Sequence, residues 1–279
     1  MSIVLNELEW TKNAIEHYEL GSNPAETLGR VAKYYKYLGL KKADIKKKVT
    51  EFLLRCDPYA SAVLWADTIE SSVKYGMKHA LIIIDKIVVT KPEISRIKKI
   101  KGVQAQRLAF TLLCIAKYMK EVSPNLDWWV NMPESDIMKM ANINTSYKRQ
   151  NLLYGQLLDA GLIQSSKRIT NLNVRVLFAE DGETAIEIRD YRNLGNQYMM
   201  LLGKQYFVCQ NCGLTVKAPD GSPAYRMKYC KDCAVKVRIR QSIDSVMRNR
   251  MLNTAARQSE GVNYASPGAV NSAEADAKT

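Results

Sequence analysis

Four cysteines near the C-terminus constrain this chain more than any other feature. They form two Cys-x-x-Cys pairs, Cys209 with Cys212 and Cys230 with Cys233, and 17 residues separate the pairs. Each pair lets two thiolates reach one ion from a tight backbone turn, and two pairs complete a tetrahedron that leaves no position for water. The spacing therefore predicts a structural Zn²⁺ site, in which the metal stabilises a fold and performs no reaction. Two disulfides, or four unrelated thiols, are the alternatives that the spacing leaves open.

The residues around these cysteines predict a zinc-finger domain over 204–252. The second Cys-x-x-Cys pair stands at the start of a predicted helix that runs from Cys233 to about Leu252, and this arrangement resembles the treble-clef class of zinc finger. The helix is rich in cations. In one interpretation, some of these cations only neutralise the negative charge of the thiolates. The length of the basic run favours the other interpretation, in which the helix contacts phosphates. The predicted contacts are Lys236, Arg238, Arg240 and Arg248.

A second pattern precedes the cysteines, and it is the element order of a helix-turn-helix followed by a hairpin. The expected elements are a helix over 104–121, a loop with Trp128 and Trp129, a short helix over 135–141, a second helix from Asn144 or Thr145 to Ala160, and strands at 162–163 and 173–178. This order resembles the winged-helix domains of replication and transcription proteins, and the step Asp159-Ala-Gly-Leu-Ile163 is its most typical part. We expect this domain and a following helix to fill 102–203.

The second helix of this pattern has the division of residues that a reading helix needs. It begins Thr145-Ser-Tyr-Lys-Arg-Gln-Asn151, which is polar and basic, and we expect Leu153, Leu157 and Leu158 to point inward. A helix-turn-helix presents the N-terminal end of its second helix to the major groove. The predicted nucleic-acid contacts are Ser146, Lys148, Arg149 and Asn151, with Lys167 and Arg168 at the tip of the hairpin. Winged helices also dock proteins, and in that interpretation the same charges are simply solvated.

The net charge of the chain agrees with a polyanionic partner. Lys and Arg number 41 against 28 Asp and Glu, which gives a net charge of +13. Such a surplus favours nucleic acid or an anionic membrane. No apolar run approaches the roughly 20 residues that a membrane span needs, and the N-terminus has no signal-peptide pattern. Cys56 and Cys114 lie in apolar helical settings and are expected to be core thiols, so we expect a reducing, cytoplasmic location in a bacterial host cell.

Residues 1–101 predict a helical domain with a short β-hairpin. Helices are expected over 3–20 and within 24–76, and the β-branched run Leu81–Thr90 predicts the hairpin. The stretch resembles the small helical domain at the C-terminus of some plasmid and phage primases. The matching residues are 23–28, 37–41, 52–58 and 68–73. The resemblance implies a role in DNA replication and carries no catalytic residues with it. A generic helical bundle is the alternative.

Little in the sequence favours catalysis. His17 and His79 are the only histidines, and no Gly-rich phosphate-binding loop is present. We therefore expect a protein that is not an enzyme. Residues 253–279 are rich in Ala, Ser, Gly and Asn and predict a disordered tail.

Together these patterns predict a mainly α-helical protein with a winged helix and a four-cysteine zinc finger. The expected function is double-stranded DNA binding in a phage or mobile element, for replication initiation or for transcriptional regulation. The alternative is an adaptor that binds a host protein, such as RNA polymerase or a defence component, through the winged helix and the zinc finger. A replisome protein and a second copy of the chain stay open as further partners.

Overall fold

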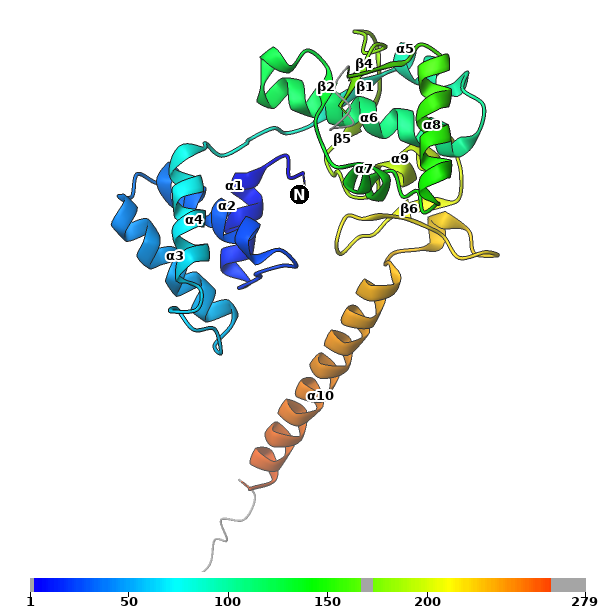
Figure 1. Ribbon diagram of the computed structural model, residues 1–279. Coiled ribbons are helices and arrows are strands. Elements are labelled where there is room, and N and C mark those ends of the chain that lie inside the picture. Colours follow the sequence, from blue (N-terminus) through cyan, green and yellow to red (C-terminus); the bar gives the residue numbers. More distant parts are fainter. Residues whose placement is uncertain (1–2, 167–172, 262–279) are drawn as a thin grey trace, which may run out of the picture. The chain divides into compact units, whose positions relative to one another are not determined.

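The fold is mainly helical, with four cysteines clustered near the C-terminus. The computed structural model describes residues 3–166 and 173–261, with side chains up to 253 (Figure 1). Within them the chain divides into two compact units. One holds the residues up to 209 together with 213–228, and the other holds 210–212 together with the residues from 229 onward. Over these described ranges, every helix is either too short or too polar to cross a membrane.

The first core cluster belongs to a group of N-terminal helices. These are α1 (Glu7–Glu16), α2 (Pro24–Tyr37), α3 (Lys42–Cys56) and α4 (Ala66–Lys78). Helix α2 begins where the sequence predicts, because the Asn23 side chain accepts a hydrogen bond from the Glu26 amide and Pro24 occupies the first turn. The apolar faces of these helices meet in a buried core made of Leu28, Val31, Ala32, Ile45, Val49, Phe52, Leu53, Ile69 and Val73.

Two helix boundaries in this region differ from prediction. Helix α1 covers less than the expected 3–20, because Asn6 caps its start by accepting a hydrogen bond from the Glu9 amide. The region 24–76 that was predicted to be helical includes Val63 and Leu64, which were expected to belong to its last helix. They precede α4 and are 84% and 85% exposed. Residues 58–59 and 62–65 form turns, so Val63 and Leu64 are not on the packed face of a helix.

A buried ionic network joins α1 to α2. The Glu7 carboxylate accepts hydrogen bonds from Lys33 Nζ at 2.9 Å and from Arg30 Nε at 3.4 Å. It also accepts one from the Ile82 amide at 2.9 Å. Arg30 pairs in addition with Glu26 at 2.6 Å. Glu7, Arg30 and Lys33 are all buried, so each charge depends on the others for compensation.

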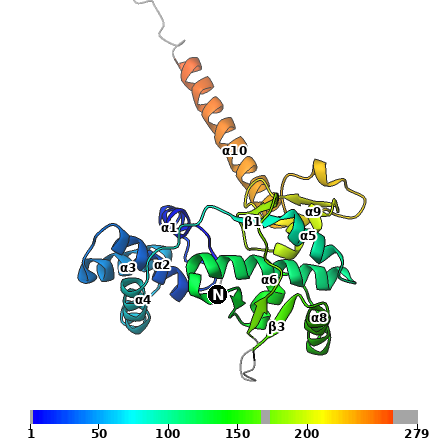
Figure 2. The same cartoon turned by 90° about the horizontal axis from the view of Figure 1, so that it is seen from above.

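The second core cluster gathers around a long apolar helix. Helix α6 (Val103–Val122) runs through this cluster, with β1, α5, α8 and α9 around it (Figure 2). Its other helices are α5 (Lys91–Lys98), α7 (Glu134–Met140), α8 (Tyr147–Asp159) and α9 (Leu194–Leu201), with a short 3-10 turn at Pro124–Leu126. A second 3-10 turn, Ala224–Arg226, lies further along the chain. The core includes Leu108, Leu112 and Ile115 of α6 and also Ile94 and Ile97 of α5, a helix that falls within the predicted first domain, 1–101.

The predicted hairpin within Leu81–Thr90 is wrong. Strand β1 (Ile87–Thr90) pairs antiparallel with β5 (Thr184–Ile188), a strand that the sequence did not predict. The residues before β1 bond instead to the N-terminal segment, where the Ile84 amide donates to the Leu5 carbonyl at 2.9 Å. A partner so distant in sequence leaves no local signal, and a run of β-branched residues is equally suited to pairing at long range.

Glu93 links the end of β1 to helices α5 and α6. Thr90 and Glu93 form a capping box that starts α5, with the Thr90 amide donating to Glu93 Oε2 at 2.7 Å. The other carboxylate oxygen, Oε1, accepts from Lys117 Nζ on α6 at 2.8 Å and from the Glu180 amide at 2.9 Å. Glu93 is fully buried, so these contacts fix the position of the loop that leads into β5.

A three-stranded antiparallel sheet closes one side of α6. It consists of β2 (Trp129–Val130), β3 (Ile163–Ser165) and β4 (Val174–Val176), in the order β2-β4-β3, with Ile163 opposite Val176. Val174, Val176 and Phe178 are buried, as the alternation in the sequence predicts. The predicted basic tip between β3 and β4, which includes Lys167 and Arg168, lies outside the described residues.

The C-terminal elements are a hairpin and a long helix. Strands β6 (Tyr206–Val208) and β7 (Thr215–Lys217) pair antiparallel, and α10 runs from Lys231 to Gly261. The prediction that the helix ends near Leu252 is wrong. The residues after Asn253, Thr-Ala-Ala-Arg-Gln (254–258), include strong helix formers, although their composition is also typical of a tail. The rest of the predicted tail, 262–279, lies outside the described residues.

Candidate metal centre and nucleic-acid interface

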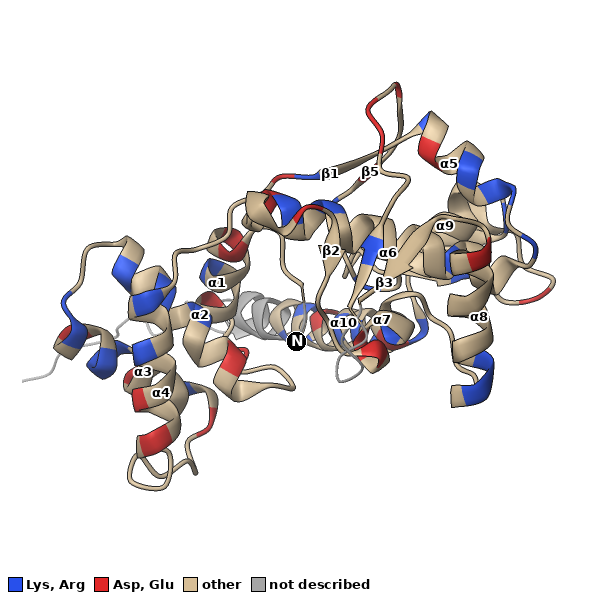
Figure 3. Ribbon diagram, turned by 45° about the horizontal axis from the view of Figure 1, so that its top comes forward, with Lys and Arg blue, Asp and Glu red and all other residues tan. Residues whose placement is uncertain are grey.

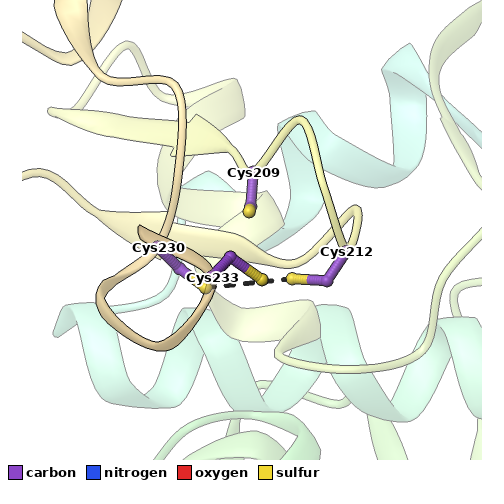
Figure 4. Close-up of side chains that lie close together, drawn as sticks. All are labelled: Cys209, Cys212, Cys230 and Cys233. Carbon is purple, nitrogen blue, oxygen red and sulfur yellow. Dashed lines mark hydrogen bonds between the residues drawn. The ribbon is translucent and has the colours of Figure 1, made fainter. Parts of the chain in front are cut away.

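Two short loops bring the four cysteines together. Cys209 follows β6 directly and Cys212 lies in the turn that leads to β7. Cys230 stands immediately before α10, and Cys233 occupies the first turn of that helix. All four Sγ atoms lie within 4.8 Å of one another (Figure 4). The pairs predicted from sequence spacing are therefore one cluster.

Backbone hydrogen bonds shape the first cysteine loop into a tight turn. The Gly213 amide donates to the Cys209 carbonyl at 2.9 Å, and the Cys209 amide donates to the Leu214 carbonyl at 3.0 Å. Gly213 has a φ of 72°, a left-handed conformation that glycine adopts without steric cost. Both side chains of this loop point toward the sulfurs of Cys230 and Cys233 (Figure 4).

The second loop places sulfur atoms at the positive end of a helix. The Ala234 amide donates to the Cys230 carbonyl at 2.8 Å, which forms the first turn of α10 around Cys233. Cys233 Sγ also accepts a hydrogen bond from Asn211 Nδ2 at 3.3 Å. Helix N-termini and amide donors both favour negative charge, so this position suits thiolates.

The spacing of the sulfurs fits a metal ion. Cys212 Sγ and Cys230 Sγ are 3.9 Å apart. A tetrahedral ion with metal–sulfur bonds of about 2.3 Å holds its ligand sulfurs about 3.8 Å apart. A disulfide needs about 2.05 Å, so these two sulfurs are too far apart to be bonded to each other. Cys209, Cys230 and Cys233 are buried and Cys212 is half-buried, so the cluster can hold a metal ion away from bulk water.

The predicted basic contacts of α10 are all exposed, but they do not share one face. Successive helical residues are rotated by about 100°, which distributes Lys236, Arg238, Arg240 and Arg248 around the helix. Exposed apolar side chains stand among them, and these are Val235, Ile239, Ile243, Val246, Met247, Met251 and Leu252. Helix α10 therefore offers positive charge on several sides over the length that has described side chains.

Helix α8 carries its cations where the sequence predicts. Lys148, Arg149 and Asn151 are exposed in its first turns, and Figure 3 shows the two cations at one end of the helix. No ion pair among the described residues involves Lys148 or Arg149. The residue before the helix is Ser146, and the predicted cap at Asn144 or Thr145 is wrong. The sequence signal was ambiguous because Asn144, Thr145 and Ser146 are all good capping residues.

The opposite side of α8 packs into the core. Leu153, Tyr154 and Leu157 are buried. The prediction that Leu153 and Leu157 point inward is therefore confirmed. Leu158 was predicted to point inward, but it is 40% exposed. It lies one residue past the packed face, so its rotation of about 100° from Leu157 turns it toward solvent.

Sequence reasoning missed a hollow beside α8. Lys101, Gly102 and the first residues of α6 line it on one side, and Arg149, Leu153 and Gln156 of α8 line it on the other. Its volume is about 300 Å³. The cations Lys101 and Arg149 are far apart in sequence, so only the packing of α6 on α8 brings them to one place.

A larger cavity in the N-terminal helices was also missed. It has a volume of about 620 Å³ and lies between α2 and α4, with the Glu7–Arg30 pair at its wall. Small residues line it where larger side chains would fill it, and these are Ala25, Gly29, Ser71 and Ser72. Their helical spacing is the signal that sequence reasoning could have used.

The remaining sequence candidates lie apart from these features. His17 is exposed at the end of α1, and the ring of His79 lies 4.4 Å from that of Tyr75. Cys114 is buried in α6, where burial raises the pKa of its thiol, and its carbonyl accepts a hydrogen bond from Tyr191 at 2.6 Å. Cys56 is half-buried.

Comparison of the chain with models of known protein families, with curated proteins and with solved structures finds no match. The resemblances drawn from sequence motifs therefore stay predictions. The features of the described residues that bear most on function are the four thiols, α8 and α10.

Proposed function

We propose that this chain is a zinc-containing protein that binds double-stranded DNA through a winged helix. The observation that carries the proposal is the succession α6, β2, α7, α8, β3, β4 with the sheet order β2-β4-β3. In a winged helix the second helix of the helix-turn-helix reads the major groove. Helix α8 has that place in the succession, and it carries exposed Lys148 and Arg149 at its N-terminal end.

The metal in this proposal is Zn²⁺, and its role is structural. Four thiolates form a donor set that prefers zinc among the common divalent ions of cells, and they leave no open coordination position. Cys209, Cys212, Cys230 and Cys233 would hold the ion and thereby anchor the start of α10. The cations of α10 then serve as a second set of phosphate contacts. No catalytic step is part of the proposal.

Two measurements test it. Elemental analysis of purified protein should find one zinc per chain, and the absence of stoichiometric zinc would exclude this metal. Binding to a labelled duplex should weaken steeply with salt, because phosphate contacts release counterions. Replacing Lys148 and Arg149 together by Ala should lower affinity and reduce the salt slope by about 2.

A matched control is available on the N-terminal helices. Lys47 and Lys74 are also exposed on helix surfaces, so their double replacement by Ala removes the same charge from the chain. We expect that variant to change duplex affinity much less. Equal losses in the two double variants would show that α8 has no special role and that only net charge matters.

A second candidate function is protein docking through α8. Tyr147 and Leu152 are 69% and 53% exposed on this helix, and exposed apolar side chains favour a protein partner. Salt separates the two candidates, because an apolar protein interface is far less sensitive to salt than duplex binding. Replication and transcription both fit the proposal. A pull-down from a bacterial host lysate, with nuclease-treated and untreated halves compared, would distinguish partners held by DNA from partners held directly.

A further inference from the structure

Glycines inside helices mark places where another surface comes close. Glycine destabilises a helix relative to alanine, so its presence there needs a compensating reason. Among the described residues, Gly29, Gly76 and Gly195 have such a reason within the chain. A Cβ added to them would stand 3.2 Å from Tyr75 Cδ1, 2.5 Å from Ala32 Cβ and 1.9 Å from the Ala141 carbonyl oxygen, respectively.

Gly155 in the middle of α8 is different. Apart from its chain neighbours and the backbone of its own helix, a Cβ added there would meet no described atom within 4 Å. Gly155 lies on the opposite side of the helix from the buried residues Leu153 and Leu157. No packing inside the molecule therefore accounts for the missing side chain.

The neighbours of Gly155 on the helix surface form a mixed basic and apolar stripe. Lys148 lies two turns before it on the same side, and Asn151 and Leu152 lie one turn before it. All three side chains are exposed. The N-terminal end of this stripe is positively charged, and the missing side chain exposes the helix backbone at its centre.

We propose that Gly155 is the point of closest approach between α8 and bound duplex DNA. This inference rests on the proposed function and adds which face of α8 enters the groove. Charge complementarity favours DNA as the occupant, because Lys148 lies at one end of the stripe, and Arg149 and Lys101 add positive charge beside it, at the hollow. Next to the bare backbone, Leu152 provides an apolar contact of the kind that thymine methyl groups accept.

Asp159 sets the far limit of this contact. It lies one turn beyond Gly155 on the same side and is exposed. Its carboxylate repels phosphates, so the duplex backbone passes over the Lys148 end of α8 and not over its C-terminal end. The part of α8 that contacts DNA is therefore confined to the residues from Ser146 to Gly155.

The test is the variant Gly155→Ala, which adds one methyl group to open space. Its helix should be more stable, and the thermal unfolding midpoint should rise by about 2 °C. Its affinity should nevertheless fall about tenfold for a fluorescein-labelled mixed-sequence duplex of about 30 base pairs, roughly three helical turns. Fluorescence anisotropy at roughly 50 mM salt measures this affinity, because phosphate contacts are strong there. Gly155→Leu should weaken binding further.

The control is Ser71→Ala on α4, an exposed helical position where alanine also raises helix propensity. It should raise the unfolding midpoint and keep wild-type affinity, which separates a gain in stability from a loss in binding. If the wild type binds and Gly155→Ala binds equally well, the inference is overturned and the proposed function stands. A lowered unfolding midpoint in Gly155→Ala would also overturn it, because the glycine would then serve the fold. If the wild type does not bind the duplex, the proposed function itself is wrong.

Discussion

Removal of one buried carboxylate should destabilise the N-terminal helices strongly. Glu7 is the shared partner of Lys33 and Arg30, and all three side chains are buried. Glu7→Gln keeps the shape of the side chain but removes its charge. Arg30 keeps its pair with Glu26 at 2.6 Å, whereas Lys33 loses the carboxylate that accepts its two hydrogen bonds.

The size of the effect follows from this difference between the two cations. Leaving a buried charge uncompensated costs about 3–5 kcal/mol. Since Gln retains one acceptor oxygen for Lys33, we expect Glu7→Gln to lose about 3 kcal/mol of unfolding free energy and Glu7→Ala to lose about 5 kcal/mol. With a typical urea dependence, the smaller loss moves the unfolding midpoint by about 1 M or more.

Urea titration followed by circular dichroism measures these changes. Glu9→Gln is the matched control, because Glu9 lies on the same helix and is exposed. We expect that control to stay within about 0.5 kcal/mol of the wild type. A loss below about 1 kcal/mol for Glu7→Gln would refute the reasoning, because it would mean that water reaches Lys33 and compensates its charge.

Further predictions concern packing, the metal loops and alkaline pH. Gly76→Ala should cost about 1–3 kcal/mol in urea unfolding, because the new Cβ would stand 2.5 Å from Ala32 Cβ; a neutral result would mean that α2 and α4 separate easily. Cys230→Ser should remove hydrogen-exchange protection from about residue 205 to 250 and leave α6 and α8 protected; lost protection that spreads into those helices would show one shared core. Burial raises the pKa of Tyr198 to about 12. The unfolded chain releases this proton from about pH 10 and the folded chain does not, so unfolding free energy should fall as pH rises from about 10 to 12, and Tyr198→Phe should show a smaller fall.

Local signals in the sequence predicted the elements that local chemistry determines. The start of α2 follows from Asn23 and Pro24, and the end of α8 follows from Gly161, which has a φ of 66°. The four cysteines form one cluster because two short loops hold the pairs and the spacing between the loops is typical of a metal site. In each case the decisive residues lie within one or two turns of the feature that they determine.

The features that the sequence did not predict correctly depend on contacts between distant residues or on positions without a local signal. Strand β1 was placed in a local hairpin because its partner lies almost a hundred residues away. Helix α4 begins after Trp65, which provides no capping side chain, so its start gave no signal. The hollow lined by Lys101 and Arg149 exists only because α6 packs on α8. Tertiary packing decides such features, and no window of sequence contains both sides of the contact.

The pairing of β1 with β5 also sets the order in which a growing chain can fold. The core of the N-terminal helices consists of residues between Leu28 and Val73, so it is complete early in synthesis. Strand β1 emerges soon afterwards, but its partner, Thr184–Ile188, leaves the ribosome only after the whole stretch from α6 to β4. Long-range strand pairing is slow, and unpaired edges attract other chains. During translation, therefore, the first half of the central core waits with an open edge until the second half has been made.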